Sequence, residues 1–148
     1  MSLIVDFLEG RGPDSSGRSI EHVLGFDSAT IERQHNFVQW VFPLLEASQA
    51  VPGSPVLTPA DVDLIRQSET AQTNLSSAAT MMAAFYGSSD HWLRSHDHNH
   101  LRITRIIKSL RLLAGDDAAD RFYDVIEGLV DASGQALNDV SRRYWATA

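Results

Sequence analysis

Apolar residues recur along this chain at the spacing of an α-helix, and no segment of useful length alternates with the period of a β-strand. In the most regular segment, several apolar residues fall on one stripe at about 100° per residue. These residues are Ile103, Ile106, Ile107, Leu110 and Leu113. Such a stripe is typical of a helix that packs against a core. The sequence therefore predicts an all-α protein.

Start and stop signals predict six or seven helices in a single domain of residues 1–148. We expect them over about 20–24, 29–42, 59–65, 74–86, 99–114, 118–130 and 138–146. The clearest start combines Thr58 as the cap, Pro59 at the first helical position and Asp61 as the partner in a capping box. The helix near 99–114 is central in this prediction, because Leu101 and Leu112 add an apolar surface opposite its main stripe.

Composition excludes several kinds of protein and site. The 148 residues include no cysteine, which excludes disulfides, thiolate metal sites and a thiol nucleophile. A net charge of -7 argues against a general nucleic-acid binder. We find no apolar run near the ~18 residues of a transmembrane helix and no secretory signal at the start, so we expect a cytoplasmic protein. One lysine against 11 arginines indicates a GC-rich microbial source.

The predicted central helix carries cations and no carboxylate, although the chain is acidic overall. If this helix begins by His98, then His98, Arg102, Arg105 and Ser109 share one strip of its surface. Two guanidinium groups on a largely covered helix need partners, because an unpaired buried charge is costly. They form either an internal network of ion pairs or a pocket for an anionic or amide-bearing ligand.

Three histidines alternate just before and within this helix, at His96, His98 and His100. Alternating side chains share a side only in an extended segment, and they diverge in a helix. Either Asp97 or Asn99 is a suitable helix cap, and no second cluster supplies a distant ligand. We therefore predict capping and surface histidines, with no bound metal and no cofactor.

Two residues of the predicted 29–42 helix are also candidates for a site. His35 falls near an apolar stripe, which favours a hydrogen-bonded core histidine over a catalytic base. Trp40 lies on a second stripe, and we interpret it as a core residue in preference to a pocket wall. No glycine-rich phosphate loop, nucleophile elbow or paired-carboxylate motif is present, so we assign no catalytic residue.

Four runs of sequence together resemble the conserved domain of the opioid growth factor receptor family. They are IERQHNFVQWVFPL, VLTPADVDLIRQS, MMAAFYG and HNHLRITRIIKSLRLLAG, in that order, and GRSIEHVLGFD resembles the opening of the domain. The resemblance implies a helical domain unrelated to seven-helix receptors. The animal protein is described as a receptor for an enkephalin peptide, and we know of no enzymatic activity in the family. One departure is Leu8, where the family's FYxG motif has a tyrosine.

On the matching positions, the resemblance implies a possible site of His35, Trp40, Asn99, Arg102 and Arg105. With His98 added from the basic strip, these residues predict a binding module for a peptide or a small anionic or amide-bearing ligand. We expect the site between the 29–42 and 99–114 helices.

Two alternatives stay open. One is an enzyme of unknown type that uses His35 or His98 as an acid or base beside the arginines. The other is a structural protein that self-associates into a homo-oligomer through exposed Trp92, Tyr144 and Trp145. We expect no nucleic-acid partner and no transmembrane segment.

Overall fold

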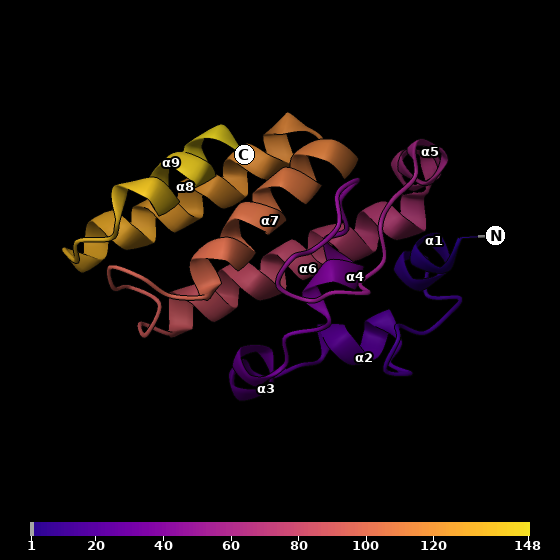
Figure 1. The fold of residues 1–148 in the computed structure, drawn as a ribbon, viewed down its shortest axis with the longest axis horizontal. Helices are drawn as coiled ribbons and strands as arrows, with labels where there is room; N and C mark the ends of the chain where they lie inside the picture. The colour runs from indigo at the N-terminus through magenta and orange to yellow at the C-terminus, as the bar shows by residue number, and fades with distance from the viewer. Residues whose placement is uncertain (1) are drawn as a thin grey trace. The chain divides into compact units, whose positions relative to one another are not determined.

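The computed structural model describes residues 2–148, and within that range it contains nine α-helices and no strand (Figure 1). The all-α prediction is therefore confirmed. The helices group into two compact units, one reaching to Ala78 and the other running from Ala79 to Ala148. The prediction of one domain over residues 1–148 stays a prediction. No helix in the described range is long and apolar enough to cross a membrane.

The first unit consists of short helices and the beginning of a long one. They are α1 (Leu3–Leu8), α2 (Ile20–Leu24), α3 (Ser28–Arg33), α4 (Val38–Val41), α5 (Pro59–Gln67) and the start of α6 (Glu69–Ser88). Helix α1 was not predicted, because its apolar run is too short to show a period. It contacts both α4 and α5.

Side-chain caps account for several of these helix starts. Ser19 accepts the backbone N–H of His22 at 3.1 Å, and Asp27 accepts that of Thr30 at 2.8 Å. The predicted capping box at Thr58 is present in both directions, with Pro59 in the first turn. Each cap satisfies a backbone N–H that has no partner within the helix. Strong start signals were therefore sufficient to place α2 and α5.

The predicted 29–42 helix is wrong, because the structure divides it into α3 and α4. The backbone of Gln34 is extended, with φ of -86° and ψ of 130°. The side chain of Arg18 explains the interruption: its guanidinium donates to Asn36 Oδ1 at 2.9 Å and reaches Gln34 Oε1 at 3.5 Å. A helix through residues 34–36 would turn these two side chains about 200° apart, away from a common donor.

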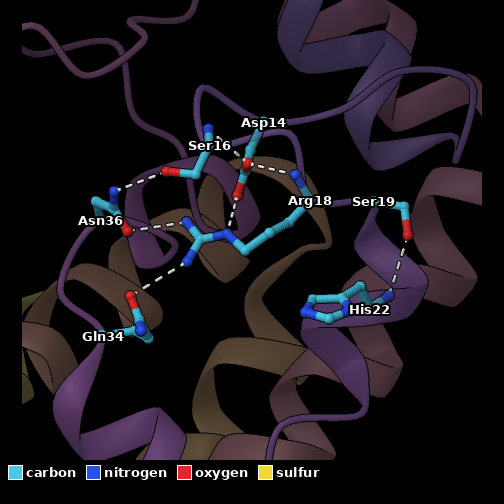
Figure 2. Close-up of polar contacts among 7 residues, drawn as sticks. All are labelled: Asp14, Ser16, Arg18, Ser19, His22, Gln34 and Asn36. Atoms are coloured by element: carbon cyan, nitrogen blue, oxygen red, sulfur yellow. Dashed lines mark hydrogen bonds and ion pairs between the residues drawn. The ribbon is translucent and has the colours of Figure 1, made fainter.

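Arg18 is in turn held by a buried carboxylate, as Figure 2 shows. Asp14 Oδ2 accepts Arg18 Nε at 2.7 Å, and its Oδ1 accepts the backbone N–H groups of Ser16 and Arg18, each at 2.9 Å. Asn36 Nδ2 also donates to Ser16 Oγ at 3.1 Å. The guanidinium lies 5.8 Å from the centre of the Phe26 ring. These residues form the Arg18 cluster, which joins the loop before α2 to the segment between α3 and α4.

The second unit contains the end of α6 and three further helices. They are α7 (Asn99–Leu113), α8 (Asp116–Ser133) and α9 (Asp139–Thr147), and α7 contacts both α8 and α9 (Figure 1). The predicted stripe of α7 is buried throughout: Ile103, Ile106, Ile107, Leu110 and Leu113 are at most 2% exposed. Helix α7 is therefore the core helix of this unit, as its period predicted.

Several predictions about individual side chains in this unit are wrong. Leu101 is 68% exposed, so the surface opposite the main stripe of α7 is not covered at its start. Trp92 and Trp145 are buried, whereas Tyr144 is exposed. Both indole rings pack in the interior of the second unit, and their N–H groups donate to backbone carbonyls there. An aromatic surface that includes these two tryptophans is therefore excluded as an interface.

We predict that Arg18→Ala lowers the free energy of unfolding by about 3 kcal/mol, because it leaves the Asp14 carboxylate buried without its cation. This loss of stability is at the low end of the range for breaking a buried ion pair, because 13% of the Arg18 side chain is exposed. Chemical denaturation measures the change.

The matched control is Arg11→Ala, because Arg11 also pairs with two carboxylates but 56% of its side chain is exposed. This variant should leave stability almost unchanged. Equal losses in both variants would show that the burial of Asp14 does not set the strength of the Arg18 cluster.

Candidate functional site

His35 lies in the segment between α3 and α4, flanked by two residues that the Arg18 cluster holds. Its neighbours Gln34 and Asn36 both face the guanidinium of Arg18, as Figure 2 shows. His35 itself is exposed, so the expectation of a core histidine is wrong. The helix that would have placed it on the apolar stripe is interrupted at this point. The arrangement presents an imidazole to solvent from an anchored stretch of backbone.

Helix α4 follows directly and buries two polar side chains. Trp40 is 5% exposed, as predicted for a core residue, and its ring meets Phe7 edge-on with centroids 5.5 Å apart. The Trp40 Nε1 atom and the Oε1 atom of Gln39 are both buried, and neither has a hydrogen-bond partner in residues 2–148. Leaving such a group unsatisfied costs about 1–3 kcal/mol. Helix α4 therefore holds one unused donor and one unused acceptor on consecutive residues.

The start of α7 carries a second cluster of polar side chains, formed by Tyr86, Asp97 and Asn99 of the second unit. Asn99 is fully buried; its Oδ1 accepts the hydroxyl of Tyr86 at 3.1 Å and its Nδ2 donates to Asp97 Oδ1 at 2.9 Å. Asp97 Oδ1 also accepts the backbone N–H of Asn99 at 2.9 Å, but the residue at the cap position is His98 and not Asp97 or Asn99 as predicted. Burial opposes ionisation of Asp97, but these bonds outweigh it and hold the pKa of the carboxyl below its ordinary value.

His100 is the buried member of the three alternating histidines. Its Nε2 lies 2.9 Å from the carbonyl oxygen of Trp92, so this nitrogen carries the proton and donates. Its own carbonyl accepts the indole N–H of Trp145 at 3.0 Å, and the two rings meet edge-on at 5.4 Å. Burial lowers the pKa of His100 below its ordinary value, against the opposing effect of the bond to Trp92. His100 thus joins the loop before α7 to helix α9.

The remaining predicted residues of α7 differ in exposure. His98 is exposed, with its Nδ1 3.7 Å from Asp97 Oδ1. Arg102 is 8% exposed and Arg105 is half-buried, and both have polar or electrostatic partners. Ser109, the last member of the predicted strip, is fully buried. The predicted strip is therefore exposed at its first residue, His98, and buried at Arg102 and Ser109.

The three alternating histidines diverge, as expected for a segment that enters a helix. His96 Nδ1 bonds to the hydroxyl of Ser95 at 3.0 Å, whereas His100 points to the backbone of Trp92. Across residues 2–148, no group of three or more histidine, cysteine or carboxylate side chains is placed to hold a metal ion.

The six predicted site residues belong to two different units. His35 and Trp40 lie in the first, and His98, Asn99, Arg102 and Arg105 lie in the second. A site shared by all six stays a prediction. Sequence analysis missed Gln39, Arg18 and the burial of His100. The sequence did contain a signal for Gln39, because it is a polar residue within the apolar run of Val38, Trp40 and Val41. A polar residue in such a run is expected to be buried and to need a hydrogen-bond partner.

The comparisons with known proteins give one family model and several relatives. Residues 19–91 match the family model of the Opioid growth factor receptor (OGFr) conserved region. The Opioid growth factor receptor of Rattus norvegicus is 35% identical over 98 residues, which cover 54% of this chain and 17% of that protein. The Opioid growth factor receptor-like protein 1 of Mus musculus is 31% identical over 114 residues, covering 64% and 24% respectively. No solved structure matches the chain.

These matches show a resemblance to a receptor family in about half of the chain. The chain spans less than a quarter of the length of the relatives it matches. The matched segment contains His35, Gln39 and Trp40, and it ends before α7 begins. The Leu8 position, where the family motif has tyrosine, lies outside this segment and is fully buried in the first unit.

We predict that the free energy of unfolding falls as the pH is lowered from about 7 to about 5, and that His100→Gln reduces this dependence. The folded state holds His100 neutral, so below an unfolded pKa of about 6.5 the unfolded chain binds more protons and is favoured. Glutamine keeps an N–H donor for the Trp92 carbonyl but does not titrate. Denaturation series at several pH values measure the slope.

The charged groups near His100 are Asp97, His96 and Arg94. The lowered pKa of Asp97 affects stability only in more acidic solution, because that contribution is lost as the pH falls below about 4. His22→Gln is the control, because His22 is exposed and is not among these charged groups, and it should change the slope less than His100→Gln does. A slope that survives in His100→Gln would place the titrating group elsewhere.

Proposed function

We propose that this chain is a receptor-like binding domain of the opioid growth factor receptor type, and that its ligand is a peptide or a small anionic or amide-bearing molecule. The observation that carries the proposal is the match of residues 19–91 to the OGFr conserved region. The relatives are named as receptors. The matched segment also contains an exposed histidine and unused polar atoms, which are groups that a ligand can engage.

Each part of the proposed site has a separate role. The exposed imidazole of His35 donates to or accepts from a polar end of the ligand, and the Arg18 cluster limits the entropy lost on binding by holding the residues on either side. Trp40 supplies its buried indole N–H, which has no partner in residues 2–148. In this proposal the main contacts come from the segment that the family model covers.

The predicted site residues at the start of α7 lie in the second unit and are mostly engaged there. His98 is the accessible one. Asn99 is already bonded to Tyr86 and Asp97, so a ligand would have to replace those bonds. Arg102 is buried and partnered, which favours internal pairing over ligand binding. No observation favours the enzyme alternative, so the binding function is the one we put forward.

Binding is tested first by thermal shift and calorimetry on the whole chain. The panel holds short peptides with free C-terminal carboxylates, the same peptides as C-terminal amides, and inorganic phosphate. A compound at about 100 times its Kd adds about 2.7 kcal/mol to the free energy of unfolding, which is readily measured. If no member of the panel stabilises the protein, the proposed ligand class is wrong.

We predict that His35→Ala weakens binding of the best compound about tenfold, while the free protein still unfolds in one cooperative transition. The loss corresponds to about one hydrogen bond to a partly charged group. His22→Ala is the matched control, because His22 is also an exposed histidine of the first unit and should bind as wild type. Equal affinity of His35→Ala and wild type would remove His35 from the site.

A further inference from the structure

The three tryptophans of this chain are all buried, but their indole N–H groups differ in one respect. Trp92 Nε1 donates to the carbonyl of Tyr86 at 3.1 Å, and Trp145 Nε1 donates to the carbonyl of His100 at 3.0 Å. Trp40 Nε1 has no hydrogen-bond partner in the described part of the chain. Buried indole donors usually have a partner, so Trp40 is the exception that needs an explanation.

The residue next to Trp40 has the opposite deficit. Gln39 is 6% exposed, and its Oε1 is a buried acceptor to which no group of residues 2–148 donates. Consecutive residues of α4 thus hold one donor and one acceptor, both more than nine-tenths buried. An anion would satisfy Trp40 Nε1 but be repelled by the oxygen of Gln39, and a cation would do the reverse. A neutral group that both accepts and donates matches the pair.

A secondary amide is such a group, because it presents a carbonyl oxygen and an N–H. We propose that Gln39 and Trp40 form a binding site for a secondary amide of the ligand. The ligand's carbonyl accepts from Trp40 Nε1, and a ligand N–H donates to Gln39 Oε1. This inference rests on the proposed function, since it places the amide of that function's ligand at α4.

The surroundings of the pair strengthen such bonds. Val38 and Val41, on either side, are at most 1% exposed, and the edge-on contact with Phe7 restricts the orientation of the Trp40 ring. Hydrogen bonds made in an apolar environment are stronger than those made in water, and their loss is more costly. A ligand group that only donates or only accepts satisfies one of the two atoms, so the pair favours a group that does both.

The inference is tested by nuclear magnetic resonance on the whole chain labelled with 15N at tryptophan. The three indole N–H signals are assigned by their through-space contacts, which for Trp40 are those to Phe7. The probe is N-methylacetamide, the smallest molecule with a secondary amide. We expect it to shift the Trp40 signal saturably and to leave the signals of Trp92 and Trp145 in place. No shift, or a common shift of all three signals, would overturn the inference.

A second probe tests the role of Gln39. N,N-dimethylacetamide keeps the carbonyl but has no N–H, so it should bind Trp40 with a Kd about fivefold to tenfold higher. Gln39→Leu should abolish this difference between the probes, because leucine has a similar size and cannot accept. Gln67→Leu, at an exposed glutamine of α5, is the control and should preserve the difference. Equal affinity of the wild type for both probes would exclude Gln39 as the acceptor.

An internal water is the competing occupant, because water also donates and accepts. A water held at this position would show a through-space contact to the Trp40 indole proton that N-methylacetamide does not remove, and that result would overturn the inference. Failure of the inference is distinguishable from failure of the proposed function. If peptides bind by calorimetry while the Trp40 signal stays in place, the chain binds its ligand elsewhere; if nothing binds, the proposed function is wrong too.

Discussion

The hydrogen bonds of the Arg18 guanidinium determine the conformation of the first unit around the candidate site. The guanidinium reaches two side chains of the segment between α3 and α4, and that segment leaves the helical conformation where these contacts are made. The buried carboxylate of Asp14 keeps the guanidinium in place. The exposure of His35 and the position of α4 both depend on this interruption, and so does any ligand site built from them.

The second unit depends on bonds between aromatic side chains and backbone carbonyls. The N–H of Trp92 closes the loop that follows α6, and the N–H of Trp145 joins α9 to the first turn of α7. His100 donates from its ring to the carbonyl of Trp92, and its own carbonyl accepts the N–H of Trp145. Each unit also holds buried polar atoms without a hydrogen-bond partner in residues 2–148: Gln39 Oε1 and Trp40 Nε1 in the first, His100 Nδ1 and Arg105 Nη2 in the second. In α4 of the first unit these atoms are a donor and an acceptor on consecutive residues.

Elements whose signals are local could be predicted from the sequence. The capping box at Thr58 and the apolar stripe of α7 depend on neighbours at most a few turns away, and both were confirmed. The long helix over 29–42 was wrong because its apolar period continues through a segment that Arg18, distant in sequence, bonds in a non-helical form. For the site, sequence analysis placed Trp40 in the core but could not show whether its N–H is satisfied, since that depends on what packs around α4.

The sequence by itself determined the all-α class, the position of the core helix α7 and the absence of cysteine chemistry. Each of these follows from residue type and from spacing along one helix. Tertiary structure decided which polar groups are used up and which are left over. Asn99 and the Nε2 atom of His100 are engaged inside the second unit, while Gln39 Oε1, Trp40 Nε1 and His100 Nδ1 are buried without partners in the described part of the chain. The physical reason is that a hydrogen bond between distant segments requires a particular distance and angle between two groups, and the type of each residue alone does not determine these.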